Sequence, residues 1–181
     1  SHGPLLKNAA KAQSRGLEYE LNWRTTRNWT NFVTVGYTHA TYDKYVRDPA
    51  QGTDYSGRFI PYVPRYTFSV GGDYRWIMRD NILSKFLHEM RFHASYHGMG
   101  KHYWNNENSL KEDYYGLLNL RLSLQFEQVG LSFWAKNALN TNYNVYMFEA
   151  FNNTYSQKNA PMRFGISLNS NLNVPNLINE R

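Results

Sequence analysis

One short stretch of the sequence carries the side chains that could do covalent chemistry. His93, Ser95 and His97 are spaced two residues apart, so they would share one face of a β-strand. Histidine and serine are two members of a hydrolytic triad, whose third member is a carboxylate that orients the imidazole. The sequence does not place Asp43 or Asp113 beside either histidine. We therefore expect wet polar side chains here and no catalytic residue.

The same histidines are poorly spaced for a metal ion. At the rise of a β-strand, positions 93 and 97 are about 13 Å apart, too far to share one ion unless the strand bends. The chain has no cysteine, which excludes disulfides and thiolate metal sites. We therefore expect neither a bound metal nor another cofactor.

A second group of candidate residues is aromatic and lies mainly in segments expected to be loops, 100–113 and 141–160. Aromatic side chains on loops stack on ligands such as aromatic chelates, porphyrins or sugars. The competing interpretation is that these rings pack between neighbouring loops. The candidate ligand-binding residues are His97, His102, Tyr103, Trp104, Tyr146, Phe148 and Phe151.

The composition is unusual for a soluble domain. The 181 residues suffice for one domain, and 17% of them are aromatic, yet the mean hydropathy is −0.68. Soluble cores depend more on Leu, Ile and Val. The net charge of +6 is scattered among acidic residues and forms no basic stripe, which disfavours a nucleic-acid partner. No apolar stretch approaches the ~18 residues of a membrane-spanning helix.

The elements that must position these side chains are predicted to be β-strands. Apolar and polar residues alternate with period two along most of the chain, and helical periodicity is nearly absent, apart from a possible helical turn within 79–87. Residues 5–12 could end an eighth strand. The alternating segments are 17–24, 29–42, 66–76, 87–99, 116–127, 129–136 and 162–169.

The connections between these strands alternate between short and long. This alternation predicts an antiparallel up-and-down sheet with turns at one end and long loops at the other, as in outer-membrane barrels. A soluble sandwich has no reason to place its long loops at one end. The shorter connections are 25–28, 78–86 and 127–129, and the long loops are 43–64, 100–113 and 141–160.

Three tryptophans support a membrane position. Trp23, Trp29 and Trp76 would lie on the apolar face at the short-turn end. Tryptophan favours the membrane–water interface because its ring is apolar and its N–H needs a wet partner. Aromatic residues that merely end soluble strands are the alternative. We therefore predict lipid against the apolar face, and a polar lumen that holds Asp73 and Arg75.

Four segments follow one another in an order and spacing that one known family shares. They are "NAAKAQSRGLEYELNWR" (8–24), "GRFIPYVPRYTFSVGGDYRW" (57–76), "FWAKNALNTNYNVYMF" (133–148) and "APMRFGISL" (160–168). The chain resembles the C-terminal part of the barrel of TonB-dependent outer-membrane receptors. The resemblance implies an all-β fold: an antiparallel up-and-down transmembrane β-barrel segment, with about 7–8 strands of a larger barrel.

The sequence departs from that family in its C-terminal end and its length. Such transporters have about 22 strands, so we expect part of a larger receptor. The final strand is followed by a polar segment without the terminal aromatic residue of the family. The predicted organisation is a cloning remnant or processed end at 1–4, barrel strands over 5–172 and a polar tail at 173–181.

The resemblance implies a function without covalent chemistry. The intact receptor would import a scarce nutrient, a ferric siderophore, haem, cobalamin or an oligosaccharide, across the Gram-negative outer membrane. Its partners would be outer-membrane lipid, that small-molecule ligand, the rest of the barrel and the plug, and the TonB complex through a part that this chain lacks.

Two other classes of protein remain open from the sequence. A complete small barrel, either a lipid-modifying enzyme or an adhesin, is the first, and the enzyme requires an acid beside His93 or His97. A soluble all-β binding module is the second. It requires burial of the leucines at 118, 120, 122 and 124 beneath another sheet.

Overall fold

The computed structural model describes residues 10–48, 52–79 and 82–170. The predictions for residues 1–4 and for the tail at 173–181 lie outside these ranges.

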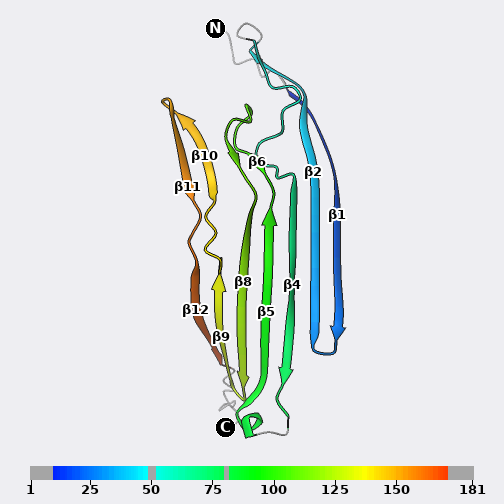
Figure 1. Cartoon of the computed structure of the whole chain (residues 1–181), viewed down its shortest axis with the longest axis vertical. Helices are drawn as coiled ribbons and strands as arrows, with labels where there is room; N and C mark the ends of the chain where they lie inside the picture. Colours follow the sequence, from blue (N-terminus) through cyan, green and yellow to red (C-terminus); the bar gives the residue numbers. More distant parts are fainter. Residues whose placement is uncertain (1–9, 49–51, 80–81, 171–181) are drawn as a thin grey trace, which may run out of the picture.

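Seven long strands form one antiparallel sheet in the order β1-β2-β4-β5-β8-β9-β12, and β3 (Thr53–Asp54) pairs with the end of β2 (Figure 1). Each long strand pairs with the long strand that follows it in the chain, so the predicted up-and-down segment of 7–8 strands is confirmed. The long strands are β1 (Ala10–Thr26), β2 (Trp29–Asp48), β4 (Tyr66–Ile77), β5 (Leu87–Met99), β8 (Tyr115–Phe126), β9 (Val129–Lys136) and β12 (Arg163–Ser170).

The smaller elements partly differ from the expectation. A short helix, η1 (Ile82–Lys85), lies in the segment where a helical turn was expected. Residues 10–12 are the start of β1 rather than the end of a separate strand. Two expected loops contain hairpins: β6 (His102–Tyr103) with β7 (Lys111–Glu112), and β10 (Asn144–Ala150) with β11 (Asn153–Lys158).

The sequence explains the β10–β11 hairpin after the fact. Its arms are rich in Val, Tyr, Phe and Thr, which favour strands. Phe151 and Asn152 connect the arms with φ of 50° and 59°. Positive φ at both central residues is the signature of a type I′ turn, whose twist suits a hairpin. Phenylalanine is an unusual residue at such a position, so the turn was not predicted.

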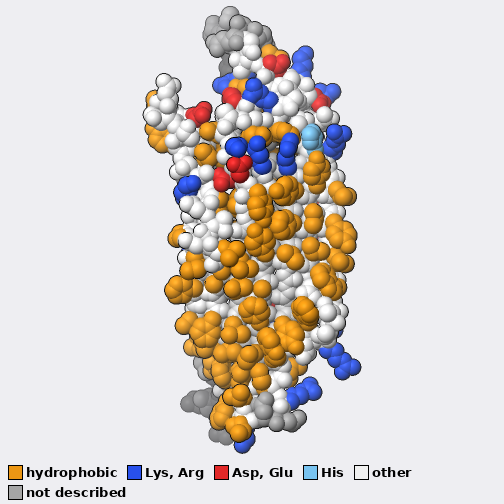
Figure 2. Space-filling view, in the orientation of Figure 1, with side chains coloured by type: hydrophobic (Ala, Val, Ile, Leu, Met, Phe, Trp, Pro, Cys, Tyr) orange, Lys and Arg blue, Asp and Glu red, His pale blue; other side chains and the backbone are white. Residues whose placement is uncertain are grey.

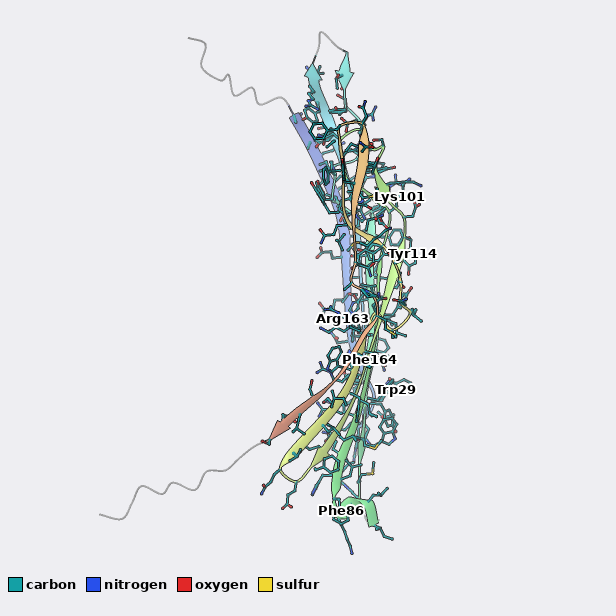
Figure 3. All side chains as sticks on the ribbon, turned by 90° about the vertical axis from the view of Figure 1, so that its left-hand side faces the viewer. Trp29, Phe86, Lys101, Tyr114, Arg163 and Phe164 are labelled. Atoms are coloured by element: carbon teal, nitrogen blue, oxygen red, sulfur yellow. The ribbon has the colours of Figure 1, made fainter. Side chains whose placement is uncertain are left out.

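The register of the strands sorts the side chains into two faces. One row of directly paired residues is apolar throughout: Leu21, Val33, Val70, Tyr96 and Leu118. Another row, on the opposite face, is mostly polar: Thr30, Asp73, His93, Arg121 and Trp134. Figure 3 shows the sheet from its edge, with Trp29 and Arg163 projecting to opposite sides.

The sheet is a single layer. Among the described residues, the leucines at 118, 120, 122 and 124 remain partly exposed, and no second sheet covers them (Figure 3). This arrangement is not the one that the soluble module requires. The buried apolar residues of the described chain lie instead near the loop end: Ala40, Tyr55, Trp104 and Leu110. No helix in the described part of the chain is long and apolar enough to cross a membrane.

Aromatic side chains lie near both ends of the apolar face. Near the short turns, the ring of Tyr74 lies 6.5 Å from Trp29 and 4.2 Å from Trp76, and Trp23 is one strand further along. Near the loops, the ring of Tyr114 stacks against those of Tyr66 and Phe68, with centroid distances of 6.4 and 6.3 Å. Its hydroxyl shares a hydrogen bond with the hydroxyl of Tyr96 at 2.8 Å. The sequence predicted the tryptophans near the short turns and missed the aromatic group near the loops. Tyr66 and Phe68 lie on the same face of β4 as Trp76, so the alternation alone would have placed them there.

An apolar band covers this face of the molecule (Figure 2), and the two aromatic groups lie toward its two ends. Tyr66 and Trp76 are ten positions apart on β4, which is about 34 Å along a strand. A strand tilt of about 40° reduces this to a height of about 25 Å, the height of the apolar band of outer-membrane barrels. Lys and Arg side chains lie above and below the band.

Candidate binding site between the loops

The polar face of the sheet separates the parts of a possible triad. His93 Nδ1 lies 3.1 Å from Asp73 Oδ1, so an acid does stand beside this histidine. The serine contacts belong to His97, whose Nδ1 is 2.8 Å from Ser69 Oγ and whose Nε2 is 3.2 Å from Ser95 Oγ. A triad needs one imidazole between the acid and the nucleophile. Neither histidine has both contacts.

Two arginines of this face form ion pairs with Glu89. Its carboxylate accepts a hydrogen bond from Arg91 at 2.8 Å and lies 3.9 Å from Arg75. Within the described ranges, no group of three or more His, Cys, Asp or Glu residues is placed to hold a metal ion.

At the loop end, two segments are fastened together by a set of side chains that we call the loop clamp: Tyr55, Arg58, Phe59, Glu107 and Asn108. Glu107 accepts hydrogen bonds from the Tyr55 hydroxyl, through its carboxylate, and from the Arg58 guanidinium, through its backbone carbonyl. Asn108 accepts from the Phe59 N–H at 2.8 Å and donates to the Phe59 carbonyl at 2.9 Å. The hydrogen bond from Tyr55 lowers the pKa of Glu107 below its usual value, which favours the carboxylate.

Next to the clamp lies a compact group that we call the loop cluster: His102, Trp104, Glu112, Asn144 and Tyr146. The ring of Trp104 lies edge-on to His102 at 4.7 Å and to Tyr146 at 6.2 Å. His102 is the cross-strand partner of Glu112, and Asn144 Nδ2 donates to Glu112 Oε2 at 2.6 Å. The cluster therefore joins the β6–β7 hairpin to β10, and its Glu112 and Asn144 are 32 positions apart.

Two polar atoms of the loop cluster are buried without a partner. Trp104 Nε1 and Asn144 Oδ1 have no hydrogen bond to any described residue, and Trp104 is only 9% exposed. The indole N–H can only donate, and the amide oxygen can only accept. Buried groups of this kind carry a free-energy cost. Neither atom reaches the surface, so a bound molecule would pair with them only by entering between the side chains of the cluster. The cluster thus holds one unpaired donor, one unpaired acceptor and several aromatic rings.

Of the seven predicted ligand-binding residues, the structure connects four. His102, Trp104 and Tyr146 belong to the loop cluster, and Phe148 continues it along β10, 5.7 Å from Tyr146. Phe148 also stacks on Tyr155 at 5.2 Å. The predicted alternative, packing between loops, thus describes much of what these rings do.

The other three predicted residues lie apart from the cluster. Tyr103 points to the opposite side of β6 from His102, and its ring stacks on that of Phe59 at a centroid distance of 5.9 Å. Phe151 stands at the tip of the β10–β11 hairpin and is 93% exposed. His97 lies on the polar face of β5. The role of all seven residues in binding stays a prediction.

Sequence reasoning missed the polar members of the loop cluster. Glu112 and Asn144 have no pattern around them that marks a site, and they meet only because β7 and β10 come together. It also missed Tyr62, whose φ of 65° is unusual for tyrosine and whose ring lies 5.6 Å from Trp104.

Comparisons with known proteins agree with this architecture. The family model for the TonB dependent receptor-like β-barrel matches residues 3–138. The pesticin receptor of Yersinia pestis is 24% identical over 163 residues, which are 90% of this chain and 22% of that receptor. The pesticin receptor of Yersinia enterocolitica is equally similar. The chain thus spans about a fifth of the length of these curated relatives.

Solved structures share the fold. The ferric yersiniabactin uptake receptor FyuA from Yersinia pestis aligns with a TM-score of 0.76 at 22% identity, over 89% of this chain and 24% of that one. The siderophore receptor PiuA from Acinetobacter baumannii aligns with a TM-score of 0.67 at 16% identity, over 88% of this chain and 22% of that one. With a family model that matches most of its length, the chain belongs to the TonB-dependent receptor-like β-barrel family.

Proposed function

We propose that this chain forms part of the barrel wall and the ligand-facing loops of a Gram-negative outer-membrane receptor that imports a scarce nutrient. The observation that carries this proposal is the single-layer sheet, which is apolar on one face, polar on the other, and bears clamped loops at one end only. Lipid would cover the apolar face, with Trp23, Trp29 and Trp76 at its boundary with water. The free edges of β1 and β12 would pair with other strands of the barrel.

A ferric siderophore is the nutrient class that we favour over haem, cobalamin and an oligosaccharide. The names of the similar structures support this class, since FyuA is a ferric yersiniabactin uptake receptor and PiuA is a siderophore receptor. The loop cluster supports it chemically, because aromatic rings with a few directed polar groups suit a flat chelate. Import would depend on a plug and on the TonB complex, which act through other parts of the receptor.

The first experiment tests the position in the membrane. The chain is purified with and without detergent, and its β-content and oligomeric state are measured by circular dichroism and light scattering. We expect a β-rich species that needs detergent and aggregates without it, because the apolar band has no cover in water. A monodisperse, cooperatively folded species in plain buffer would contradict the proposal.

The second experiment tests the loop cluster in the whole receptor. The substitution Trp104→Phe keeps most of the ring and removes the N–H, which has no partner among the described residues. We expect stability to change modestly, because the smaller ring loses buried packing while an unpaired buried donor is removed, and affinity for the ligand to fall about tenfold, the value of one buried hydrogen bond. Binding is measured with a panel of ferric yersiniabactin, haem, cobalamin and maltohexaose.

The matched control is Trp134→Phe, which removes an indole N–H that donates to Ser167 on the polar face at 3.2 Å. It should leave the affinity unchanged. If the Trp104→Phe variant and the parent bound every probe with equal affinity, the loop cluster would not be part of the binding site. Binding of haem, cobalamin or the oligosaccharide without the ferric chelate would overturn the choice of siderophore.

A further inference from the structure

Lys and Arg side chains gather directly above the apolar band, on the same face of the molecule (Figure 2). Arg15 and His39 are cross-strand partners, and they continue the face of Leu17 and Tyr37, which are also partners. Lys101 projects to the same side of the sheet as Tyr114 and Trp29 (Figure 3). These basic side chains therefore border the apolar band on the side that we assign to lipid.

Two aromatic rings connect the group. The ring of Phe59 contacts His39 at 5.5 Å, Tyr103 at 5.9 Å and the guanidinium carbon of Arg65 at 4.1 Å. The ammonium of Lys101 lies 5.1 Å from the ring of Tyr103. Lys111 is the cross-strand partner of Tyr103. We call this group the rim patch: Arg15, His39, Phe59, Arg65, Lys101, Tyr103 and Lys111.

The rim patch keeps a positive charge. Arg15, Arg65 and Lys101 form no ion pair with any described residue, whereas Lys111 lies 3.2 Å from Asp113. By contrast, Arg75 and Arg91 on the polar face both form ion pairs with Glu89. Three cations without an acid, two of them against aromatic rings, make a site for an anion with several negative charges.

We propose that the rim patch binds the phosphate groups of a membrane lipid headgroup in the leaflet on the loop side. The patch lies beside the apolar band, at the level where headgroups begin, and guanidinium and ammonium groups are the usual partners of phosphate. This inference rests on the proposed function, because a headgroup reaches the patch only when the band is embedded in a bilayer.

The geometry favours a lipid over a soluble ligand at this position. Successive residues of β6 point to opposite sides, so Tyr103 belongs to the rim patch while His102 and Trp104 belong to the loop cluster. A soluble nutrient and a lipid headgroup would therefore be bound on different sides of the same strand, without competition.

The test uses the whole receptor in detergent with two probes, lipid A that carries two phosphates and lipid A from which the phosphates have been removed. Binding is measured by native mass spectrometry and by co-purification. For the triple variant Arg15→Gln, Arg65→Gln and Lys101→Gln we expect affinity for the phosphorylated probe to fall about a hundredfold, since each cation near a membrane surface contributes about a fivefold share. The dephosphorylated probe should bind the parent as weakly as the phosphorylated probe binds the variant.

A matched triple variant removes the same charge from the polar face: Arg24→Gln, Arg121→Gln and Lys136→Gln. It should bind lipid within about twofold of the parent, because salt screens charges that lie farther than a Debye length from the headgroup. Retained binding in the rim variant, or equal binding of both probes to the parent, would overturn the inference. Competition by inorganic phosphate alone, or capture of an acidic protein in place of lipid, would overturn it as well.

The receptor proposal and this inference fail in different ways. A receptor that does not enter detergent micelles as a folded barrel contradicts the proposed function. A folded barrel that ignores the phosphates contradicts only the assignment of the rim patch. Folding of each variant is followed separately, by circular dichroism and by the shift in gel migration on heating.

Discussion

The sheet and the loop end of this chain are held together by different means. In the sheet, backbone ladders connect the strands, and both faces remain largely uncovered by protein. At the loop end, the few buried apolar side chains of the described residues gather, and long-range side-chain hydrogen bonds such as that between Tyr55 and Glu107 join the segments. The sheet depends on its surroundings for stability, while the loops carry a small core of their own.

This difference has a consequence for function. A ladder in lipid is fixed because every backbone group must find a partner within it. Loops in water have no such constraint, and would lose entropy on binding a ligand unless they were already ordered. The loop clamp orders the two segments that it joins, which under the proposed function would lower the entropy lost on binding.

The largest effect should come from a charge on the apolar face. Leu120 pairs with Ala94 and Ala135 in the middle of the band. We expect Leu120→Arg to lower the free energy of unfolding of the receptor in lipid vesicles by about 2–4 kcal/mol, the cost of a cation near the middle of a bilayer. Unfolding in guanidinium, followed by tryptophan fluorescence, measures the change.

The same substitution on the other face serves as the control. Leu117 belongs to β8 as well but is the partner of His97 on the polar face. Leu117→Arg should cost less than about 1 kcal/mol, since the cation stays in water. Similar losses for both variants would show that the two faces share one environment, and the assignment of lipid to one of them would be wrong.

A smaller effect is expected where the sheet meets the aromatic residues near the loops, which we call the upper aromatic group: Tyr66, Phe68, Tyr96 and Tyr114. Phe68 is the cross-strand partner of Gly98, and its ring lies over that glycine, so an added Cβ would overlap the ring. We expect Gly98→Ala to cost about 1–3 kcal/mol in the same unfolding measurement, the usual range for an overfilled position.

Gly36 provides the comparison within the sheet. A Cβ at Gly36 would lie 3.0 Å from the Thr67 hydroxyl, which can rotate away. Gly36→Ala should therefore cost less than the change at Gly98. If both substitutions were neutral, the ring of Phe68 would have another position, and the upper aromatic group would not be fixed as described.

The loop end should respond to acid before the sheet does. Because the pKa of Glu107 is lowered in the folded loops, its contribution to stability is complete above the unfolded value of 4.5 and is lost as the pH falls through the lower folded value. Hydrogen exchange of residues 100–113, corrected for the intrinsic rate, should therefore accelerate a few-fold as the pH falls below 4.5.

Tyr55→Phe tests the cause of this response. The variant lacks the hydroxyl that lowers the pKa of Glu107, so exchange of the loop should be faster at neutral pH and should change less with acid. Exchange in β8 should be the same in both proteins. A full acid response without the Tyr55 hydroxyl would assign the effect to another group.

The two regions also differ in how far the sequence predicts them. A strand places successive side chains on opposite faces whatever it packs against, so the alternation sufficed to predict the seven long strands and their apolar face. The positions of Trp23, Trp29 and Trp76 on the apolar face could be predicted for the same reason. The upper aromatic group was missed because Tyr114 precedes β8 and joins Tyr66 and Phe68 only in three dimensions.

The loop end was less predictable because its contacts join distant residues. Tyr55 and Glu107 are 52 positions apart, and Glu112 and Asn144 are 32 apart. No local period relates such pairs. The aromatic composition of the loops indicated His102, Trp104, Tyr146 and Phe148, but only the structure shows the polar atoms that accompany them and the separation of Tyr103 and Phe151 from the group.

The smallest effect should come from a substitution on the polar face, and its size reports whether water or protein lies against that face. Asp73 and His93 are 3.1 Å apart with side chains 43% and 35% exposed, and ion pairs in such wet surroundings contribute about 0–1 kcal/mol. Asp73→Asn, which keeps an oxygen for the histidine, should change the free energy of unfolding by less than about 0.5 kcal/mol where this face meets water.

Asp73→Asn becomes more informative when it is measured twice, in the whole receptor and in a receptor whose plug has been deleted. If the plug covers this part of the lumen, it removes water from Asp73, and the cost of losing the charge should rise well above the wet value in the whole receptor only. Equal and small values in both proteins would mean that water fills the lumen beside Asp73. The polar face would then resemble the loops in its exposure to water, and the apolar face alone would tie the sheet to its surroundings.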